Sequence, residues 1–97
     1  MQIAEKEKTK IIQLIKAIVP EVTIILFGSH ARNGATANSD IDLALDAGRY
    51  LSSAEYTEIV GVLDGTSLPY SFDILDMHNA SDTIKKSIEQ EGIKWTI

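Results

Sequence analysis

The stretch that decides the fold reads LFGSHARNG over residues 26–34 and SDIDLAL over residues 39–45. An apolar segment runs into a Gly-Ser turn, a polar excursion follows, and a second segment alternates acidic and apolar residues. Because successive side chains of a strand point to opposite faces, Asp40 and Asp42 are expected on one face and the apolar residues on the other. The stretch therefore predicts two strands joined by a glycine-containing turn, with a ligand site at the turn and the acid pair.

Patterns on both sides of this stretch alternate between helix and strand. Residues 3–19 repeat apolar side chains at helical spacing up to Pro20, which ends a helix. Residues 22–27 are a continuous apolar and β-branched run, typical of a strand buried on both faces. Helices that alternate with strands predict an α/β (α+β) domain in which helices cover a small sheet. The other expected elements are a strand over residues 40–46, a helix from Ser52 or Ser53 to about Gly65, a strand over residues 71–75, a helix from Ser81 to Gly92 and a short strand over residues 93–97.

Length and composition set further bounds. The 97 residues are enough for one domain, residues 1–97, and too few for two. No apolar run approaches the roughly 18 residues that cross a bilayer, and the charged first residues lack the apolar segment of a signal peptide. The absence of cysteine excludes disulfides and thiolate chemistry. We therefore expect a cytoplasmic protein without membrane contact.

Charge narrows the class of ligand. The formal net charge is −5, and the Lys and Arg residues are scattered along the chain. Extended binding of nucleic acid requires a basic surface that neutralises phosphates, so this class of partner is excluded. A small anionic ligand remains compatible with the charge, because divalent cations that accompany it invert the local electrostatics.

Asp40 and Asp42 carry the chemistry expected of the second strand. Two carboxylates at positions i and i+2 of a strand repel each other unless a cation compensates them. Magnesium binds one or two carboxylates together with phosphate oxygens, and two metal ions about 3.5–4 Å apart assist phosphoryl or nucleotidyl transfer. The alternative is that both acids belong to the solvated face of an amphipathic strand. Asp is disfavoured in strands, so the pair beside a well-packed apolar face favours the metal site.

Asp73 is a third candidate, a lone acid between Phe72 and Ile74. If its strand lies beside residues 40–46, its carboxylate joins the same cluster. It then serves either as a metal ligand or as the general base that deprotonates an attacking hydroxyl.

Gly28 and Ser29 are expected to hold a phosphate. Glycine lets the backbone come close to a ligand, and a helix that begins at Ser29 offers free N–H groups to an anion. The alternative is an ordinary glycine turn with a serine cap. Arg32 is expected either to contact a phosphate or to form a salt bridge with one of the acids. Other polar and aromatic residues are interpreted as structural: His30 and His78 as loop residues, Asp46 and Asp76 as solvated strand-end acids, and Tyr50, Tyr56, Tyr70 and Trp95 as core or interface residues.

The segment from Gly28 to Arg32 and the segment from Ser39 to Leu43 resemble the signature of the DNA polymerase β-like nucleotidyltransferase superfamily. The resemblance is greatest to its small stand-alone members, the minimal nucleotidyltransferases (MNT) of bacteria and archaea, and it extends over nearly the whole chain. It implies the nucleotidyltransferase fold, a small mixed sheet covered by helices. Asn33 stands where the family usually has Gly, and because Asn tolerates the left-handed conformation we expect the turn to be retained.

The resemblance also assigns roles to the candidate residues. It implies that Asp40 and Asp42 bind two Mg²⁺ ions, that Asp73 completes the catalytic triad of carboxylates, and that Gly28 and Ser29 hold the triphosphate. The implied reaction moves a nucleoside monophosphate from an NTP to an acceptor hydroxyl and releases pyrophosphate. Family habit favours ATP as the donor.

A partner protein is implied as well. Minimal members are often paired with a small helical HEPN-domain protein in toxin–antitoxin modules, where the nucleotidyltransferase acts as antitoxin and can adenylylate a tyrosine of its partner. Larger relatives carry an extra helical domain that grips base and acceptor, so here a partner or a second copy of the chain (a homo-oligomer) is expected to supply acceptor recognition. The alternative is a catalytically weak or inactive binding module of the same fold that neutralises its partner by contact.

Overall fold

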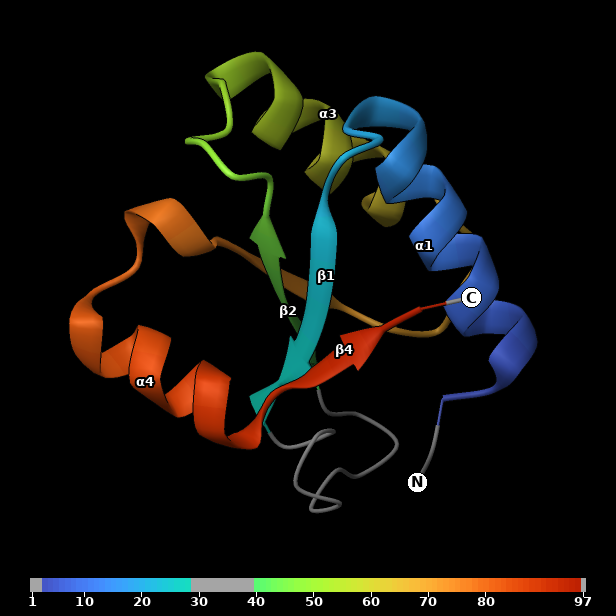
Figure 1. Ribbon diagram of the computed structural model, residues 1–97. Coiled ribbons are helices and arrows are strands. Elements are labelled where there is room, and N and C mark those ends of the chain that lie inside the picture. Colours follow the sequence, from blue (N-terminus) through green and yellow to red (C-terminus); the bar gives the residue numbers. More distant parts are fainter. Residues whose placement is uncertain (1–2, 29–39, 97) are drawn as a thin grey trace.

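The computed structural model describes residues 3–28 and 40–96. Each expected element that falls in the described residues is present within a few residues of its predicted bounds (Figure 1). The helix expected to begin at Ser29 lies outside the described residues. In chain order the described elements are α1 (Glu5–Ile18), β1 (Thr23–Phe27), β2 (Ile41–Asp46), α3 (Ser53–Asp64), β3 (Phe72–Asp76), the 3-10 helix η1 (Met77–Asn79), α4 (Asp82–Glu91) and β4 (Ile93–Trp95).

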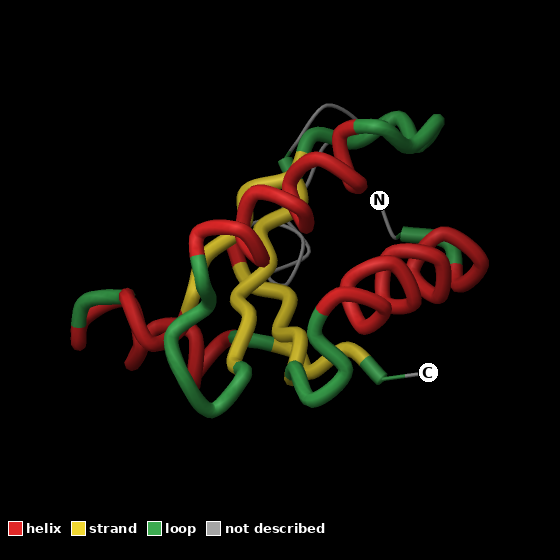
Figure 2. Tube along the Cα trace, turned by 90° about the horizontal axis from the view of Figure 1, so that it is seen from above, coloured by secondary structure: helices red, strands yellow, loops and turns green. Residues whose placement is uncertain are grey.

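The four strands form one mixed sheet in the order β3-β2-β1-β4. Strand β1 pairs antiparallel with both β2 and β4, whereas β2 and β3 run parallel. Helices α1 and α4 lie on opposite sides of the sheet, as the view from above shows (Figure 2). The prediction of a small mixed sheet covered by helices is therefore confirmed. Within the described residues, no helix is both long and apolar enough to span a membrane.

One face of the sheet packs against α1 and α3 and forms the main core. The alternation of β2 puts Ile41, Leu43 and Leu45 on this face, and all three are completely buried. The helices contribute side chains at helical spacing, so that one stripe of each helix meets the sheet. Buried helix residues of this core are Ile11, Ile12 and Ile15 of α1 and Ile59 and Leu63 of α3.

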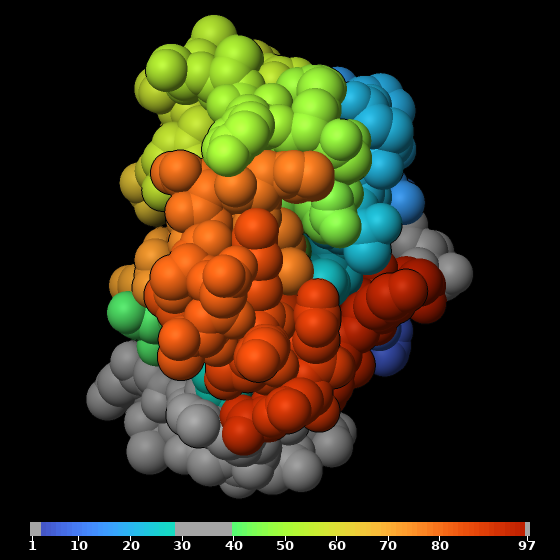
Figure 3. Space-filling model, turned by 60° about the vertical axis from the view of Figure 1, so that its left-hand side comes forward, coloured from blue at the N-terminus to red at the C-terminus, as the bar shows by residue number. Residues whose placement is uncertain are grey.

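Among the described residues, those of α4 and η1 cover the opposite face. Its buried residues are Ala44, Met77 and Ile88, and Phe27 and Ile25 of β1 are only partly buried beside them. The expectation that residues 22–27 form a strand buried on both faces is therefore wrong for this side of the sheet. Figure 3 views the molecule from that side, with α4 in orange and red at the front.

The serines predicted to begin helices can now be assigned. Ser52, rather than Ser53, caps α3: its hydroxyl accepts from the backbone N–H of Glu55, whose carboxylate in turn accepts from the Ser52 N–H. Ser81 caps α4 by accepting from the N–H of Ile84 at 3.3 Å. These caps set the entry of each helix after a strand and hence where each helix crosses the sheet.

Three of the four aromatic residues predicted as core or interface residues are buried or hydrogen-bonded within the fold, and the fourth is exposed. Trp95 is buried in the main core, and the Tyr70 hydroxyl donates to Glu7 of α1 at 2.8 Å. The Tyr56 hydroxyl donates to the backbone carbonyl of Ile74, at 3.0 Å. Tyr50, on the β2–α3 connection, is 66% exposed, so it is not a core residue, and its predicted alternative, an interface role, stays a prediction.

Candidate functional site

Parallel pairing of β2 and β3 brings two of the predicted acids together. Asp42 of β2 and Asp73 of β3 are register partners, so their side chains leave the same face of the sheet from strands about 4.8 Å apart. Asp42 is half-buried and Asp73 is exposed. The condition set for Asp73, that its strand lie beside residues 40–46, is therefore met. Phe27, which pairs with Asp42 from the β1 side, lies on this same face.

Gly28 shapes the space around Asp42. It follows β1 directly and has a φ of +73°, a left-handed conformation that side chains other than glycine's rarely adopt. A Cβ placed at this position would collide with the Asp42 carboxylate, lying 2.9 Å from its Cγ and closer still to Oδ2. Glycine is thus required here for two reasons, backbone conformation and close approach to Asp42. Predicting this contact needs the pairing of β1 with β2, because 14 positions separate the two residues in sequence.

Asp40 lies at the entrance to β2 and is exposed. The next residue, Ile41, donates its N–H to the Ser71 carbonyl at 2.8 Å, which fixes the start of β2 against the residue before β3. Asp40 therefore adjoins the Asp42–Asp73 pair without belonging to the strand. Ser29 and Arg32, the other two candidates for phosphate contact, lie outside the described residues.

The carboxylates suit a magnesium ion that arrives with phosphate. In residues 3–28 and 40–96, no three His, Asp or Glu side chains are gathered into a ready-made metal site. Magnesium does not need such a cage, because in nucleotide sites one or two carboxylates hold it together with phosphate oxygens and water. Asp42 and Asp73 supply hard oxygen donors from adjacent strands, and Gly28 lets the backbone pass close to the Asp42 carboxylate. These two carboxylates therefore fit a magnesium ion whose other ligands are phosphate oxygens and water.

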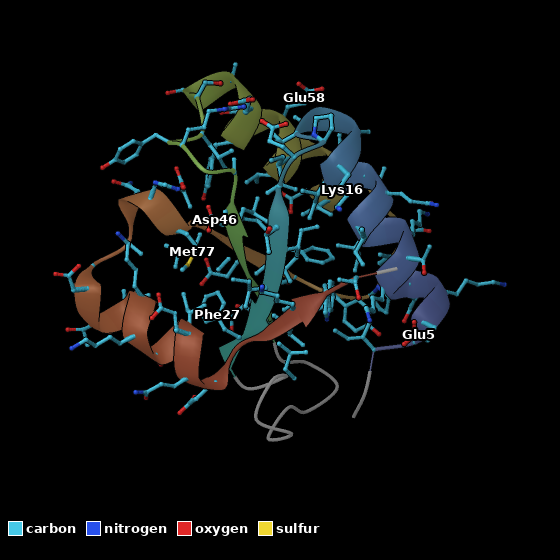
Figure 4. The ribbon with its side chains drawn as sticks, viewed as in Figure 1. Glu5, Lys16, Phe27, Asp46, Glu58 and Met77 are labelled. Atoms are coloured by element: carbon cyan, nitrogen blue, oxygen red, sulfur yellow. The ribbon has the colours of Figure 1, made fainter. Side chains whose placement is uncertain are left out.

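A cavity of about 280 Å³ adjoins Asp73, between α4 and the sheet. Phe27, Leu75, Ile84 and Ile88 give it a mainly apolar lining, and Asp73 and Ser87 add one carboxylate and one hydroxyl. Figure 4 shows Phe27 on the side of the sheet that faces α4. The sequence alone did not indicate this cavity, because it depends on how far α4 stands from the strands.

Acids at the far end of β2 and β3 hold a loop in place. The Asp76 carboxylate accepts from the Leu51 N–H at 2.9 Å and from the His78 N–H at 3.0 Å. Asp46 accepts from the Gly48 N–H at 2.9 Å, and His78 Nε2 lies 3.2 Å from the same carboxylate oxygen. Asp46 and Asp76 are strand-end acids, as predicted, and both stay partly exposed. Their solvated role is incomplete, because they also tie the β2–α3 connection to η1.

The whole chain can also be compared with known protein families. The family model for "Polymerase beta, Nucleotidyltransferase" matches residues 9–94, and the chain belongs to this family. Members of the family generally use a divalent metal ion.

Two similar curated proteins carry names that place them among the protein adenylyltransferases. The protein adenylyltransferase MntA of Shewanella oneidensis is 30% identical over 86 residues, which are 88% of this chain and 61% of that protein. A Methanocaldococcus jannaschii protein, whose name assigns it provisionally to the protein adenylyltransferases, is 38% identical over 76 residues, 73% of each chain. The chain thus spans less than two thirds of the length of the Shewanella relative.

Solved structures agree in fold. A toxin–antitoxin complex with AMP-PNP matches 92% of this chain and 72% of the solved chain, with a TM-score of 0.79 and 29% identity. A structure of tri-AMPylated Shewanella oneidensis HEPN toxin with MNT antitoxin matches 92% of this chain and 68% of that chain, with a TM-score of 0.71 and 27% identity. The resemblance to the minimal nucleotidyltransferases is confirmed.

Proposed function

We propose that the protein is a magnesium-dependent adenylyltransferase that moves AMP from ATP to a tyrosine hydroxyl of a helical HEPN-type partner, and so acts as an antitoxin. Residues 1–97 serve as one minimal nucleotidyltransferase domain. The observation that carries the proposal is the register of Asp42 with Asp73 beside the Gly28 turn, in a chain of the polymerase β nucleotidyltransferase family.

Each candidate residue has a role in this reaction. Asp40, Asp42 and Asp73 provide the oxygen donors for two Mg²⁺ ions, which supply neutralisation of charge on the phosphates when bound. Gly28, Ser29 and Arg32 hold the triphosphate. Asp73, on the exposed edge strand, accepts the proton of the acceptor hydroxyl. The hydroxyl oxygen forms a bond to the α-phosphorus, the bond from that phosphorus to the bridging oxygen breaks, and pyrophosphate leaves.

The relatives support the choice of nucleotide and partner. One solved relative is a toxin–antitoxin pair with AMP-PNP, an ATP analogue, and another holds an AMPylated HEPN toxin beside its MNT antitoxin. The name of the Shewanella relative states protein adenylylation directly. ATP as donor and a protein hydroxyl as acceptor are the assignments consistent with both.

The proposal is tested by labelling. The chain is incubated with magnesium and ATP labelled at the α-phosphate, together with HEPN-domain proteins from its own genome. We expect label on a tyrosine of one HEPN protein with the wild type and none with Asp42→Asn. If Asp42→Asn and the wild type bind and neutralise the HEPN protein equally, with no label in either case, the alternative of an inactive binding module replaces the proposal.

A further inference from the structure

We propose that the cavity between α4 and the sheet receives the aromatic ring of the acceptor side chain and directs its phenolic hydroxyl to Asp73. The inference rests on the proposed function and adds to it the place where acceptor specificity is decided. The cavity adjoins Asp73 directly, and Asp73 is the register partner of Asp42. A group bound there lies next to the carboxylates and on the side of the sheet opposite the main core.

The size of the cavity suits one side chain. Sites that enclose a whole small-molecule ligand have volumes of about 300–1,000 Å³. This cavity has about 280 Å³, which is below that range. A single ring fits this volume, which is small for a complete nucleoside triphosphate. The occupant is therefore a part of a larger molecule that remains mostly outside.

The lining distinguishes a phenol from a nucleobase. Four apolar side chains, Phe27, Leu75, Ile84 and Ile88, surround a ring, and two polar groups, those of Asp73 and Ser87, line the same cavity. A nucleobase carries several donors and acceptors around its edge, and burying them without partners is costly. A phenol has one polar group, which a single carboxylate satisfies while the ring contacts the apolar lining.

The cavity can be reached from the surface, as a side chain of a partner protein requires. Ile84, Ser87 and Ile88 recur at positions i, i+3 and i+4 of α4, so one stripe of this helix forms the cavity wall. Ile88 is buried, but Ser87 is exposed and Ile84 is 43% exposed, so the outer part of the wall reaches the surface. Figure 3 shows α4 on the outside of the molecule, with no described element in front of it. An aromatic side chain projecting from a partner can enter beside this helix.

The test fills the cavity without substituting any of the carboxylates. Ser87→Trp places an indole at the wall, and Gln90→Trp, an exposed position of the same helix outside the lining, is the matched control. Binding of p-cresol, a free phenol, is followed by NMR of the backbone amides. Binding of magnesium and ATP is measured by calorimetry, and AMP transfer to the HEPN acceptor by α-phosphate label.

We expect p-cresol to shift the amide signals of Phe27, Ile84 and Ser87 in the wild type and in Gln90→Trp, but not in Ser87→Trp. AMP transfer should fall at least tenfold in Ser87→Trp while its affinity for magnesium and ATP stays within twofold of wild type. Loss of ATP affinity in Ser87→Trp would overturn the inference in favour of a nucleobase site, and an absence of p-cresol shifts in the wild type would also overturn it. If p-cresol binds as expected but the wild type transfers no AMP to any acceptor, the proposed function fails and the phenol site stands.

Discussion

The two faces of the sheet differ in how completely they are closed. On one face, α1 and α3 bury Ile41, Leu43 and Leu45 of β2 completely. On the other, α4 covers the sheet only in part, leaving Asp42 half-buried and a cavity of about 280 Å³ beside Asp73. The same strand thus contributes to the stability of the fold on one side and to the candidate site on the other. Adjacent residues of β2 should therefore have separable effects on folding and on ligand binding.

The largest effect is expected on the closed face. Leu43 is fully buried in the main core, so Leu43→Ala removes buried apolar volume and leaves a cavity. We expect the free energy of unfolding to fall by about 2–5 kcal/mol, measured by urea denaturation. The fraction that remains folded should bind magnesium and ATP with unchanged affinity. A loss below about 1 kcal/mol, or folded protein that no longer binds ATP, would contradict the separation of the two faces.

Two glycine substitutions compare a position that contacts Asp42 with a position where an added side chain contacts nothing. Gly28 and Gly48 both have left-handed backbone, with φ of +73° and +75°. A Cβ at Gly48 meets nothing within 4 Å, whereas at Gly28 it collides with the Asp42 carboxylate. We expect Gly48→Ala to cost roughly 1–2 kcal/mol from backbone conformation alone. Gly28→Ala should cost about 1–3 kcal/mol more, because the collision is added.

The same pair also tests the site. Gly28→Ala displaces the Asp42 carboxylate, so its affinity for magnesium and ATP should fall at least about tenfold, as for other changes that misplace a metal ligand. Gly48→Ala should bind as the wild type does. Equal stability and equal ATP affinity in the two variants would show that the approach of Gly28 to Asp42 has no consequence.

The smallest effect concerns the loop at the far end of the sheet. Arg49 donates to both carboxylate oxygens of Glu55 at 2.8 Å and lowers the Glu55 pKa from 4.5 to about 2. The folded chain therefore binds fewer protons at this group than the unfolded chain, and the stabilisation is complete above pH 4.5 and lost as the pH falls towards 2. We expect Glu55→Gln to reduce the slope of stability against pH in this window, measured by thermal denaturation. An identical slope of stability against pH in wild type and variant would show that Glu55 does not contribute to the loss of stability in acid.

Sequence patterns predicted the strands and the helix N-caps better than they predicted the sheet face that lies next to α4. The alternation of residues 41–46 and the serines before α3 and α4 are local signals, and the structure confirms them. The partner of Asp73 required knowledge of which strands pair, so the sequence stated it only as a condition. The apolar run of β1 predicts a strand buried on both faces, but it does not show that Ile25 and Phe27 are only partly buried beside α4.

Contacts between distant segments could not be predicted from the sequence either, because they also depend on how the strands and helices pack. Asp46 and His78 are 32 positions apart, and nothing in either local pattern indicates that they meet. Tyr50 was predicted to be a core or interface residue, and only the structure shows that it is exposed and therefore outside the core. In both cases the tertiary arrangement, and not the intrinsic preference of the residue, decided the outcome.

Calorimetric titration of ATP, with and without magnesium, into the wild type and Asp42→Asn tests most directly whether the open face holds the nucleotide site. Asp42→Asn keeps the side-chain shape and removes the charge, so its melting temperature should stay close to that of the wild type. We expect ATP to bind the wild type only with magnesium, and the affinity to fall at least about 100-fold in Asp42→Asn, as expected for loss of a direct metal ligand. Magnesium-dependent binding that is equally tight in a folded Asp42→Asn variant would contradict a nucleotide site built on this face of the sheet.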